Sequence, residues 1–175
     1  MRNFRDRCAL FALILTTSAC GTAGNEPMSV LGDPNKSLVG EITLPIAVTS
    51  FATLTSFSST TDGFELLNLN AIGVSQSIAA PLGGYVSGID STQIVIVHNS
   101  HVSTRLSRLA SVVVRVGDYV TAGQVLGTSA VTSGIVVRLA VMVDGVAVCP
   151  YSYLSASARS DINSRIAPTG QILCQ

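Results

Sequence analysis

The residues best able to do chemistry in this chain are few. Its two histidines, His98 and His101, form a His-x-x-His pair that could offer two nitrogen ligands to a metal ion. A structural zinc ion needs four ligands, so the pair alone is weak evidence for a metal site. No serine lies on a Gly-x-Ser-x-Gly elbow with a histidine and a carboxylate to activate it. We therefore predict neither a metal nor another cofactor.

Cys20 marks the end of a segment that has the pattern of an export signal. Three arginines near the N-terminus precede the apolar residues 8–15, and small residues lead to Cys20. The residues Thr-Ser-Ala-Cys-Gly at 17–21 resemble a bacterial lipoprotein cleavage box, in which Cys20 becomes the lipidated first residue. The alternative is plain secretion after a small-residue cleavage site.

Two further cysteines, Cys149 and Cys174, stay in the mature chain if the signal is removed. Exported proteins meet an oxidising compartment, where cysteines commonly pair. A disulfide between Cys149 and Cys174 would tie the C-terminal tail to the core. The alternative is two unpaired thiols, because sequence does not show the distance between Cβ atoms.

Length and composition predict one domain without a nucleic-acid partner. The chain has 175 residues, of which 47% are hydrophobic and 11% charged, and its formal net charge is zero. A balanced charge lacks the basic surface on which nucleic-acid binding depends. We expect a signal peptide at residues 1–20, a Gly- and Pro-containing tether at 21–45, a β domain at 46–155 and a tail at 156–175.

The β domain is predicted from short β-branched runs separated by glycine or aspartate. Candidate strands cover residues 84–86, 93–98, 111–116, 134–143 and 146–148. The dipeptide Asp144-Gly145 between the last two predicts a two-residue hairpin turn. Residues 155–165 are polar and fit either a short helix or a loop. The fold class is therefore all-β, with the short strands of a small sandwich or barrel.

Several of these runs resemble the lysostaphin-type (LytM) zinc endopeptidases of bacterial cell walls. The matching segments lie at residues 78–86, 94–98, 115–127, 134–141 and 149–154. The strongest is Arg-Val-Gly-Asp-Tyr-Val-Thr-Ala-Gly-Gln-Val-Leu-Gly at 115–127, a turn also found in lipoyl-type domains. Its glycines suit tight corners, and its alternating apolar residues suit an interior face. The resemblance implies a small barrel-sandwich hybrid.

The chain departs from this family at the residues that do the family's chemistry. These peptidases bind one zinc ion through two histidines and one aspartate, and another histidine assists proton transfer. On an ungapped match, two of the histidine positions fall on Val136 and Arg138, and the assisting histidine falls on Arg108. Glu65 could hold the first histidine position and Leu69 the aspartate position. Valine has no lone pair and arginine only donates, so the resemblance implies a pseudo-peptidase.

Two arginines would then line the former substrate groove. Alternation along the late strand puts Val136 and Arg138 on one face, and the resemblance places Arg108 beside it. One hypothesis is that Arg108 and Arg138, with Arg105, bind carboxylates of cell-wall stem peptides or of an acidic partner. The alternative is that Glu65 neutralises the arginines and the groove is merely filled.

The resemblance implies a non-catalytic envelope lipoprotein that binds or regulates peptidoglycan-remodelling machinery, for example by activating an amidase. Its partners would be peptidoglycan, an amidase or another envelope protein, and the membrane through the lipid anchor. One alternative is a structural or adaptor lipoprotein, and another is an endopeptidase whose atypical metal site includes His98. We expect an exported protein on a membrane facing the periplasm or cell exterior, and the outer membrane where two exist, because Gly21 and not aspartate follows Cys20.

Overall fold

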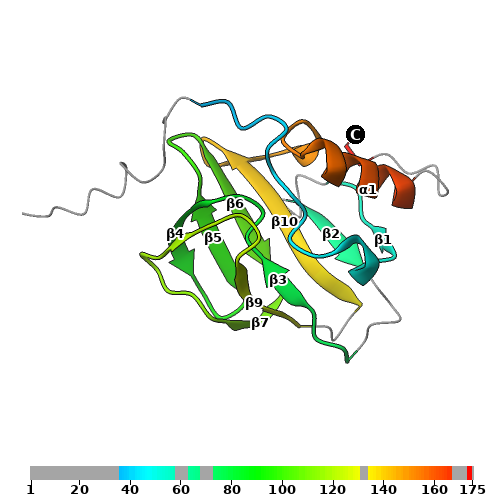
Figure 1. The fold of residues 1–175 in the computed structure, drawn as a ribbon, viewed down its shortest axis with the longest axis horizontal. Coiled ribbons are helices and arrows are strands. Elements are labelled where there is room, and N and C mark those ends of the chain that lie inside the picture. The colour runs from blue at the N-terminus through cyan, green and yellow to red at the C-terminus, as the bar shows by residue number, and fades with distance from the viewer. Residues whose placement is uncertain (1–35, 58–62, 68–72, 131–133, 167–172, 175) are drawn as a thin grey trace, which may run out of the picture.

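The computed structural model describes residues 36–57, 63–67, 73–130, 134–166 and 173–174. Within them the chain forms two antiparallel sheets and one α-helix, so the expected β fold is confirmed, without a closed barrel (Figure 1). The large sheet has the order β1 (Thr53–Leu54), β2 (Phe64–Leu67), β10 (Ile135–Val143), β6 (Val102–Ser107), β5 (Gln93–Val97), β4 (Gly84–Ile89) and β8 (Tyr119–Val120), and β11 (Val146–Val148) pairs with β10. The small sheet has the order β3 (Ser77–Ala79), β9 (Val125–Ser129) and β7 (Leu109–Val112).

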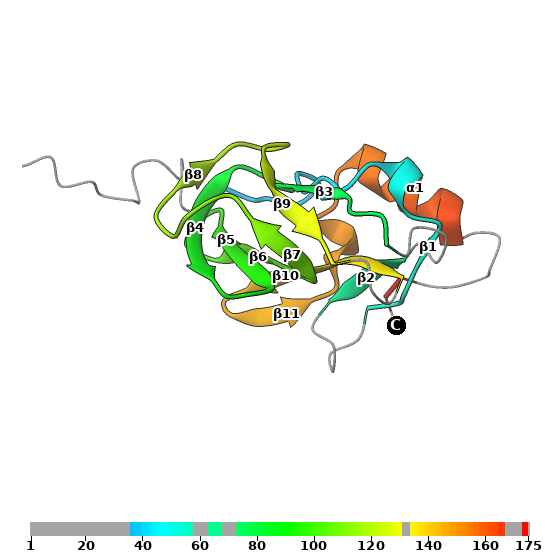
Figure 2. The same ribbon diagram turned by 90° about the horizontal axis from the view of Figure 1, so that it is seen from below.

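The hydrophobic core follows from the two-residue period of the strands. Along β5 and β6 every second side chain is buried, including Ile94, Ile96 and Leu106. The small sheet contributes Ile78 and Leu126 to the same buried cluster. Figure 2 shows this small sheet, with β9 and β7, lying against the larger one. Burial of apolar side chains between the sheets therefore holds the two layers together.

The hairpin turn predicted at Asp144-Gly145 is confirmed. Asp144 has φ +49° and Gly145 has φ +79°, the left-handed values that a type I′ turn requires at both central residues. The flanking residues Val143 and Val146 are paired across β10 and β11. The turn therefore fixes the register of this end of β10.

The expected tether ends earlier than residue 45. Leu38 and Ile42 are buried, and Ile42 forms a parallel bridge with Leu154. Its N–H donates to the Tyr153 carbonyl at 2.9 Å, and its own carbonyl accepts from Ser155 at 2.8 Å. The boundary at residue 45 is therefore wrong, because the backbone and apolar side chains of residues 36–45 pack on the domain. The signal segment 1–20, Cys20 and residues 21–35 lie outside the described residues.

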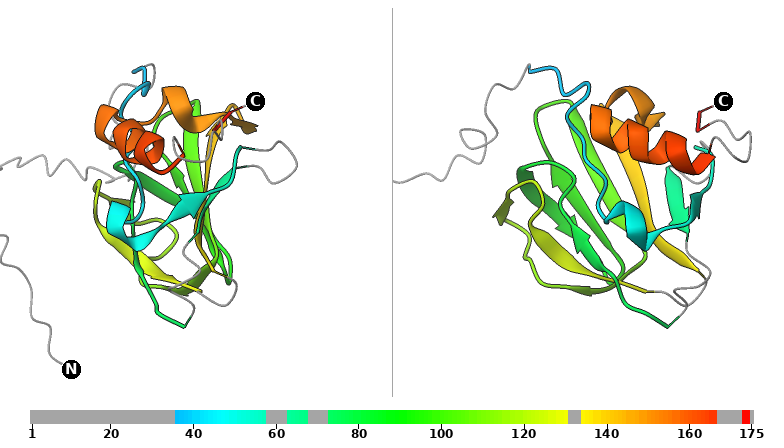
Figure 3. Two further views of the ribbon diagram at one scale, coloured as in Figure 1. Left: turned by 90° about the vertical axis from the view of Figure 1, so that its right-hand side faces the viewer. Right: turned by 45° about the vertical axis from the view of Figure 1, so that its right-hand side comes forward.

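The C-terminal segment also belongs to the packed domain. Helix α1 (Ala156–Ile166) buries Ala158, Ile162 and Ile166, which recur on one face every four residues. The Ser155 hydroxyl accepts from the Ala158 N–H at 3.2 Å and caps its start. Figure 3 shows α1 lying across one end of the large sheet. The polar tail expected at 156–175 is thus a helix over its first eleven residues.

A disulfide joins Cys149 and Cys174, whose Cα atoms are 5.8 Å apart. The preceding residue, Leu173, is buried, and its carbonyl accepts from the Phe57 N–H at 2.6 Å. The cross-link and this hydrogen bond hold the end of the chain against the sheet. None of the helices in the described ranges has the length and apolarity needed to cross a bilayer.

Candidate functional site

Three charged residues that lie far apart in the sequence meet on one face of the large sheet. Strand β10 is paired with β2 on one side and with β6 on the other. In that register Arg138 is opposite both Glu65 and Ser107. Directly opposed residues of antiparallel strands project to the same face. The sheet therefore brings the Arg138 guanidinium to the Glu65 carboxylate, and Arg108 follows Ser107 at the end of β6.

These three residues form what we call the Glu65 cluster: Glu65, Arg108 and Arg138. The Glu65 Oε1 atom accepts hydrogen bonds from Arg138 Nε at 3.0 Å and from Arg138 Nη2. Arg108 Nη2 lies 4.0 Å from the same oxygen, an ion-pair distance without a hydrogen bond. The Glu65 side chain is only 13% exposed, whereas those of Arg138 and Arg108 are 25% and 46% exposed. The pair with Arg138 is thus the shielded one.

The cluster occupies three of the positions that the lysostaphin-type resemblance assigned to zinc chemistry. Glu65 matches the first histidine, Arg138 a later one and Arg108 the assisting one. Leu69, matched to the aspartate, lies outside the described residues. Of the alternatives raised by the sequence, the structure brings Glu65 and Arg138 together as a hydrogen-bonded ion pair. That pairing leaves Arg108 as the more exposed cation of the cluster.

Val136 does not lie beside Arg138 as strand alternation predicted. The register of β10 against β2 shifts between Ile135, opposite Leu67, and Val137, opposite Leu66. A β-bulge of this kind inserts one extra residue and breaks the two-residue period. Val136 and Val137 are both fully buried in the hydrophobic cluster. The expectation that Val136 lines the groove is therefore wrong, because the bulge turns its side chain into the core.

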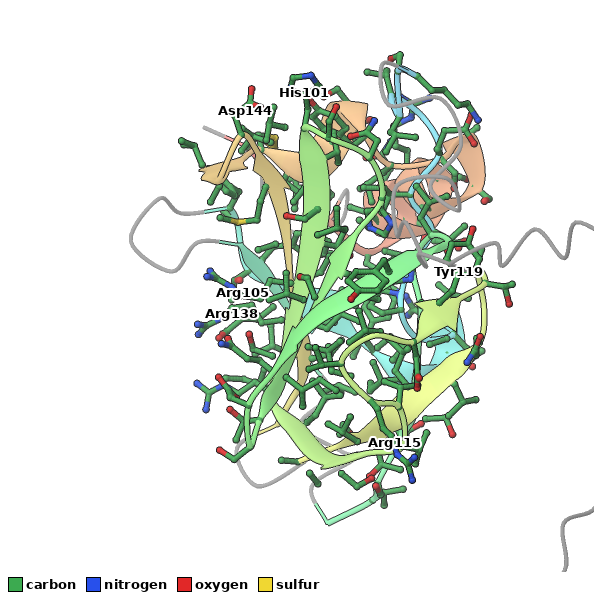
Figure 4. All side chains as sticks on the ribbon, turned by 90° about the vertical axis from the view of Figure 1, so that its left-hand side faces the viewer. His101, Arg105, Arg115, Tyr119, Arg138 and Asp144 are labelled. Atoms are coloured by element: carbon green, nitrogen blue, oxygen red, sulfur yellow. A yellow bond between two sulfur atoms is a disulfide. The ribbon has the colours of Figure 1, made fainter. Side chains whose placement is uncertain are left out.

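Arg105 lies on the same face of the sheet as Arg138. It is opposite Ala140, two residues along β10 from Arg138. Figure 4 shows the Arg105 and Arg138 side chains projecting from the same side of the molecule. Arg105 also makes an interaction of its own.

The two histidines have separate surroundings. The His98 Nδ1–H donates to the Gly83 carbonyl at 2.8 Å, so Nε2 accepts from the Thr104 hydroxyl at 2.9 Å. Both ring nitrogens are used, and His98 is only 4% exposed. His101 is exposed, and its Nδ1 contacts Asp144 Oδ1 at 2.7 Å. The His-x-x-His spacing therefore does not create a shared site.

The His101–Asp144 pair ties two turns together at one end of the large sheet (Figure 4). The Asp144 N–H also donates to the His101 carbonyl at 2.8 Å. Sequence reasoning did not find this pair, because 43 positions separate its members. Across the described ranges, no group of three His, Cys, Asp or Glu side chains could hold a metal ion.

Burial lowers the pKa of His98 to about 4, against an ordinary 6.5, and the hydrogen bond to Gly83 offsets part of that shift. The unfolded chain therefore takes up a proton at His98 between pH 6.5 and about 4, while the folded chain does not. We expect the free energy of unfolding to fall by roughly 2–3 kcal/mol across this window as pH decreases.

Denaturant unfolding at pH 7, 5 and 4 measures this dependence. A His98→Gln variant should lose this part of the pH slope, whatever its absolute stability. A His101→Gln variant is the matched control and should keep it. Equal pH slopes for wild type and His98→Gln would contradict the assignment.

Comparison with known proteins gives a fold. No protein-family model and no curated protein matches this sequence. Among solved structures, a chain of the SpoIIQ-SpoIIIAH pore forming complex is similar at 21% identity with TM-score 0.54, covering 68% of this chain and 93% of that one. The M23 metalloprotease pseudoalterin from the deep sea matches at 20% identity with TM-score 0.54, covering 65% and 78%.

A zinc containing peptidase from Vibrio cholerae is similar at 18% identity with TM-score 0.52. The match covers 61% of this chain and 38% of the peptidase. At these identities the likeness establishes architecture and not activity. The chain therefore has the fold of the M23 (LytM) peptidases, as the sequence motifs predicted.

Proposed function

We propose that this chain uses the M23 peptidase fold as a non-catalytic binding module that holds or regulates a component of the bacterial envelope. The observation that carries the proposal is the Glu65 cluster. Where the resemblance expects two zinc-binding histidines and one assisting histidine, the chain has a hydrogen-bonded carboxylate–guanidinium pair and a second guanidinium.

The chemistry of these side chains argues against zinc hydrolysis at this place. Arginine stays protonated and offers only N–H donors, so it repels a dication. Glu65 is engaged by Arg138, and a single carboxylate is fewer than the three protein ligands of a catalytic zinc. A site without a metal-bound water lacks the nucleophile that such peptidases use.

An atypical metal site that includes His98 finds no support. Both ring nitrogens of His98 are already hydrogen-bonded, to the Gly83 carbonyl and to the Thr104 hydroxyl. Glu65 is bonded to Arg138, which lies opposite it on β10. Among the described residues, His98 belongs to no group of three His, Cys, Asp or Glu side chains that could hold a metal, and binding one would also require breaking a buried hydrogen bond.

The SpoIIQ-SpoIIIAH chain supports a role in assembly over cleavage of the cell wall. Of the three structures described above, it is the one matched over the largest share of its own length, 93%. Its structure is that of a complex between SpoIIQ and SpoIIIAH. By analogy, the present chain would contact an envelope protein, such as a peptidoglycan amidase that it activates, or peptidoglycan itself. An adaptor of an envelope assembly without a peptidoglycan role is the second candidate.

The proposal also includes export of the chain and its attachment to a membrane through Cys20. The signal pattern ending at Cys20 supports transport and lipidation, with the domain facing the periplasm or the cell exterior. In a cell with two membranes, the outer membrane is the expected location.

Elemental analysis of the purified chain and a muropeptide release assay test the proposal. We expect substoichiometric zinc, even after incubation with zinc salts, and no release of muropeptides from sacculi. Pull-downs with sacculi and with solubilised envelope proteins then separate the two candidates. Stoichiometric zinc together with cleavage of cross-bridges would overturn the non-catalytic function.

A further inference from the structure

The charges of the Glu65 cluster do not balance. Its single carboxylate faces the Arg138 and Arg108 guanidinium groups. Arg138 holds the carboxylate through two donors, whereas Arg108 remains 4.0 Å away. Among residues 36–57, 63–67, 73–130, 134–166 and 173–174, no second carboxylate lies within ion-pair distance of Arg108. Within the three described residues of the cluster, one positive charge is therefore in excess over the carboxylate.

The backbone at Arg108 adopts a strained conformation. Arg108 has φ +76°, a left-handed conformation that glycine or asparagine adopts more easily. It lies between β6 and β7, where its carbonyl accepts from Ala130 at 2.8 Å and the next N–H, of Leu109, donates to Thr92 at 3.0 Å. Both bonds engage the peptide group between Arg108 and Leu109 and fix its orientation. A long cationic side chain is thus presented from a fixed backbone.

Within the part of the chain that the structure describes, no side-chain hydrogen bond engages the Arg108 guanidinium. Its side chain is 46% exposed, and the contact with Glu65 is too long for a hydrogen bond. A guanidinium presents a planar fork of N–H groups that matches the two oxygens of a carboxylate. The hydrogen bonds from Arg138 to Glu65 hold the Arg138 guanidinium near Arg108. An anion bound to Arg108 would therefore meet a second guanidinium without a large rearrangement.

We propose that Arg108 binds a carboxylate group of the ligand, with Arg138, fixed by Glu65, as the neighbouring positive group. The inference rests on the proposed function and names the chemistry by which the module recognises its partner. A guanidinium fork also fits phosphate, so inorganic phosphate is included in the experiment as a competing anion. The carboxylate can be the C-terminus of a peptide or an acidic side chain, and the experiment distinguishes the two.

The test follows the Nε–Hε NMR signals of isotope-labelled arginines in the full chain during titration. The probes are N-acetyl-alanyl-alanine, its C-terminal amide, N-acetylglutamate α-amide and inorganic phosphate. We expect saturable shifts of the Arg108 signal with at least one carboxylate probe and none with the amide. Arg108→Gln should weaken binding about tenfold or more, and Arg108→Lys less, because lysine keeps the charge but loses the fork.

Arg115→Gln is the matched control. Arg115 is also exposed but lies away from Arg105 and Arg138 (Figure 4), so its loss should leave the affinity unchanged. Equal binding of acid and amide, tighter binding of phosphate than of either carboxylate, or equal losses in the Arg108 and Arg115 variants would each overturn the site. If the chain binds no carboxylate probe but still lacks zinc and captures an envelope partner, the carboxylate site is ruled out while the non-catalytic function remains supported.

Discussion

Replacing Glu65 with alanine is expected to lower the free energy of unfolding by roughly 2–3 kcal/mol, because it removes two charge-assisted hydrogen bonds and leaves the partly shielded Arg138 guanidinium without its counter-charge. The Glu65 side chain is only 13% exposed, and its Oε1 receives two Arg138 donors. Removal of the carboxylate also brings Arg108 and Arg138 into unrelieved repulsion. Urea or guanidinium unfolding at neutral pH measures the loss.

A double variant separates the ion pair from simple packing. Glu65→Leu with Arg138→Met replaces both charges by apolar side chains, and its stability should lie within about 1 kcal/mol of wild type. Glu41→Ala removes an exposed pair with Lys36 at 3.6 Å and should cost less than about 1 kcal/mol. If Glu65→Ala costs no more than Glu41→Ala, the Glu65 cluster does not stabilise the sheet.

Local turn chemistry was the part of the fold that sequence predicted well. The motif at residues 115–127 predicted tight corners at its glycines, and Gly117 and Gly123 have φ +101° and +81°. The Asp118 carboxylate accepts from the Arg115 N–H at 2.8 Å and closes the first corner. Such turns depend on residues that are close in sequence, so their types are sufficient to identify them.

The site required information that is not local. The bulge at Val136 depends on how β10 pairs with β2, and the register of residues 60–77 was uncertain without that partner. Placing Glu65 opposite Arg138 therefore needed the assembled sheet. The extent of the domain was missed for a related reason. Ile42 is an isolated apolar residue in a loop-like stretch, and only its contact with Leu154 shows that it belongs to the core.

Gly127, the last glycine of the 115–127 motif, lies within strand β9 and not at a tight turn as the motif predicted. It lies in the central strand of the small sheet, opposite Ile78 on β3 and Val112 on β7. A Cβ atom at this position would overlap the Ser111 carbonyl oxygen and would lie 2.9 Å from the Ser111 carbonyl carbon and 3.2 Å from Val112 Cα. All three are backbone atoms, so no side-chain rotation relieves the clash. The glycine is required because two strands approach closely.

Gly127→Ala is therefore expected to destabilise the chain by more than about 4 kcal/mol or to prevent folding, because β7 must separate from β9. Gly88→Ala is the matched control, since a Cβ there meets only the Val95 side chain, at 3.9 Å or more, and should change stability by less than about 1 kcal/mol. Thermal unfolding of both variants measures the difference. Strand β7 begins directly after Arg108, so any folded Gly127→Ala protein should also lose the carboxylate-dependent shift of Arg108. A variant as stable as Gly88→Ala, with that shift intact, would show that the small sheet does not position the arginine.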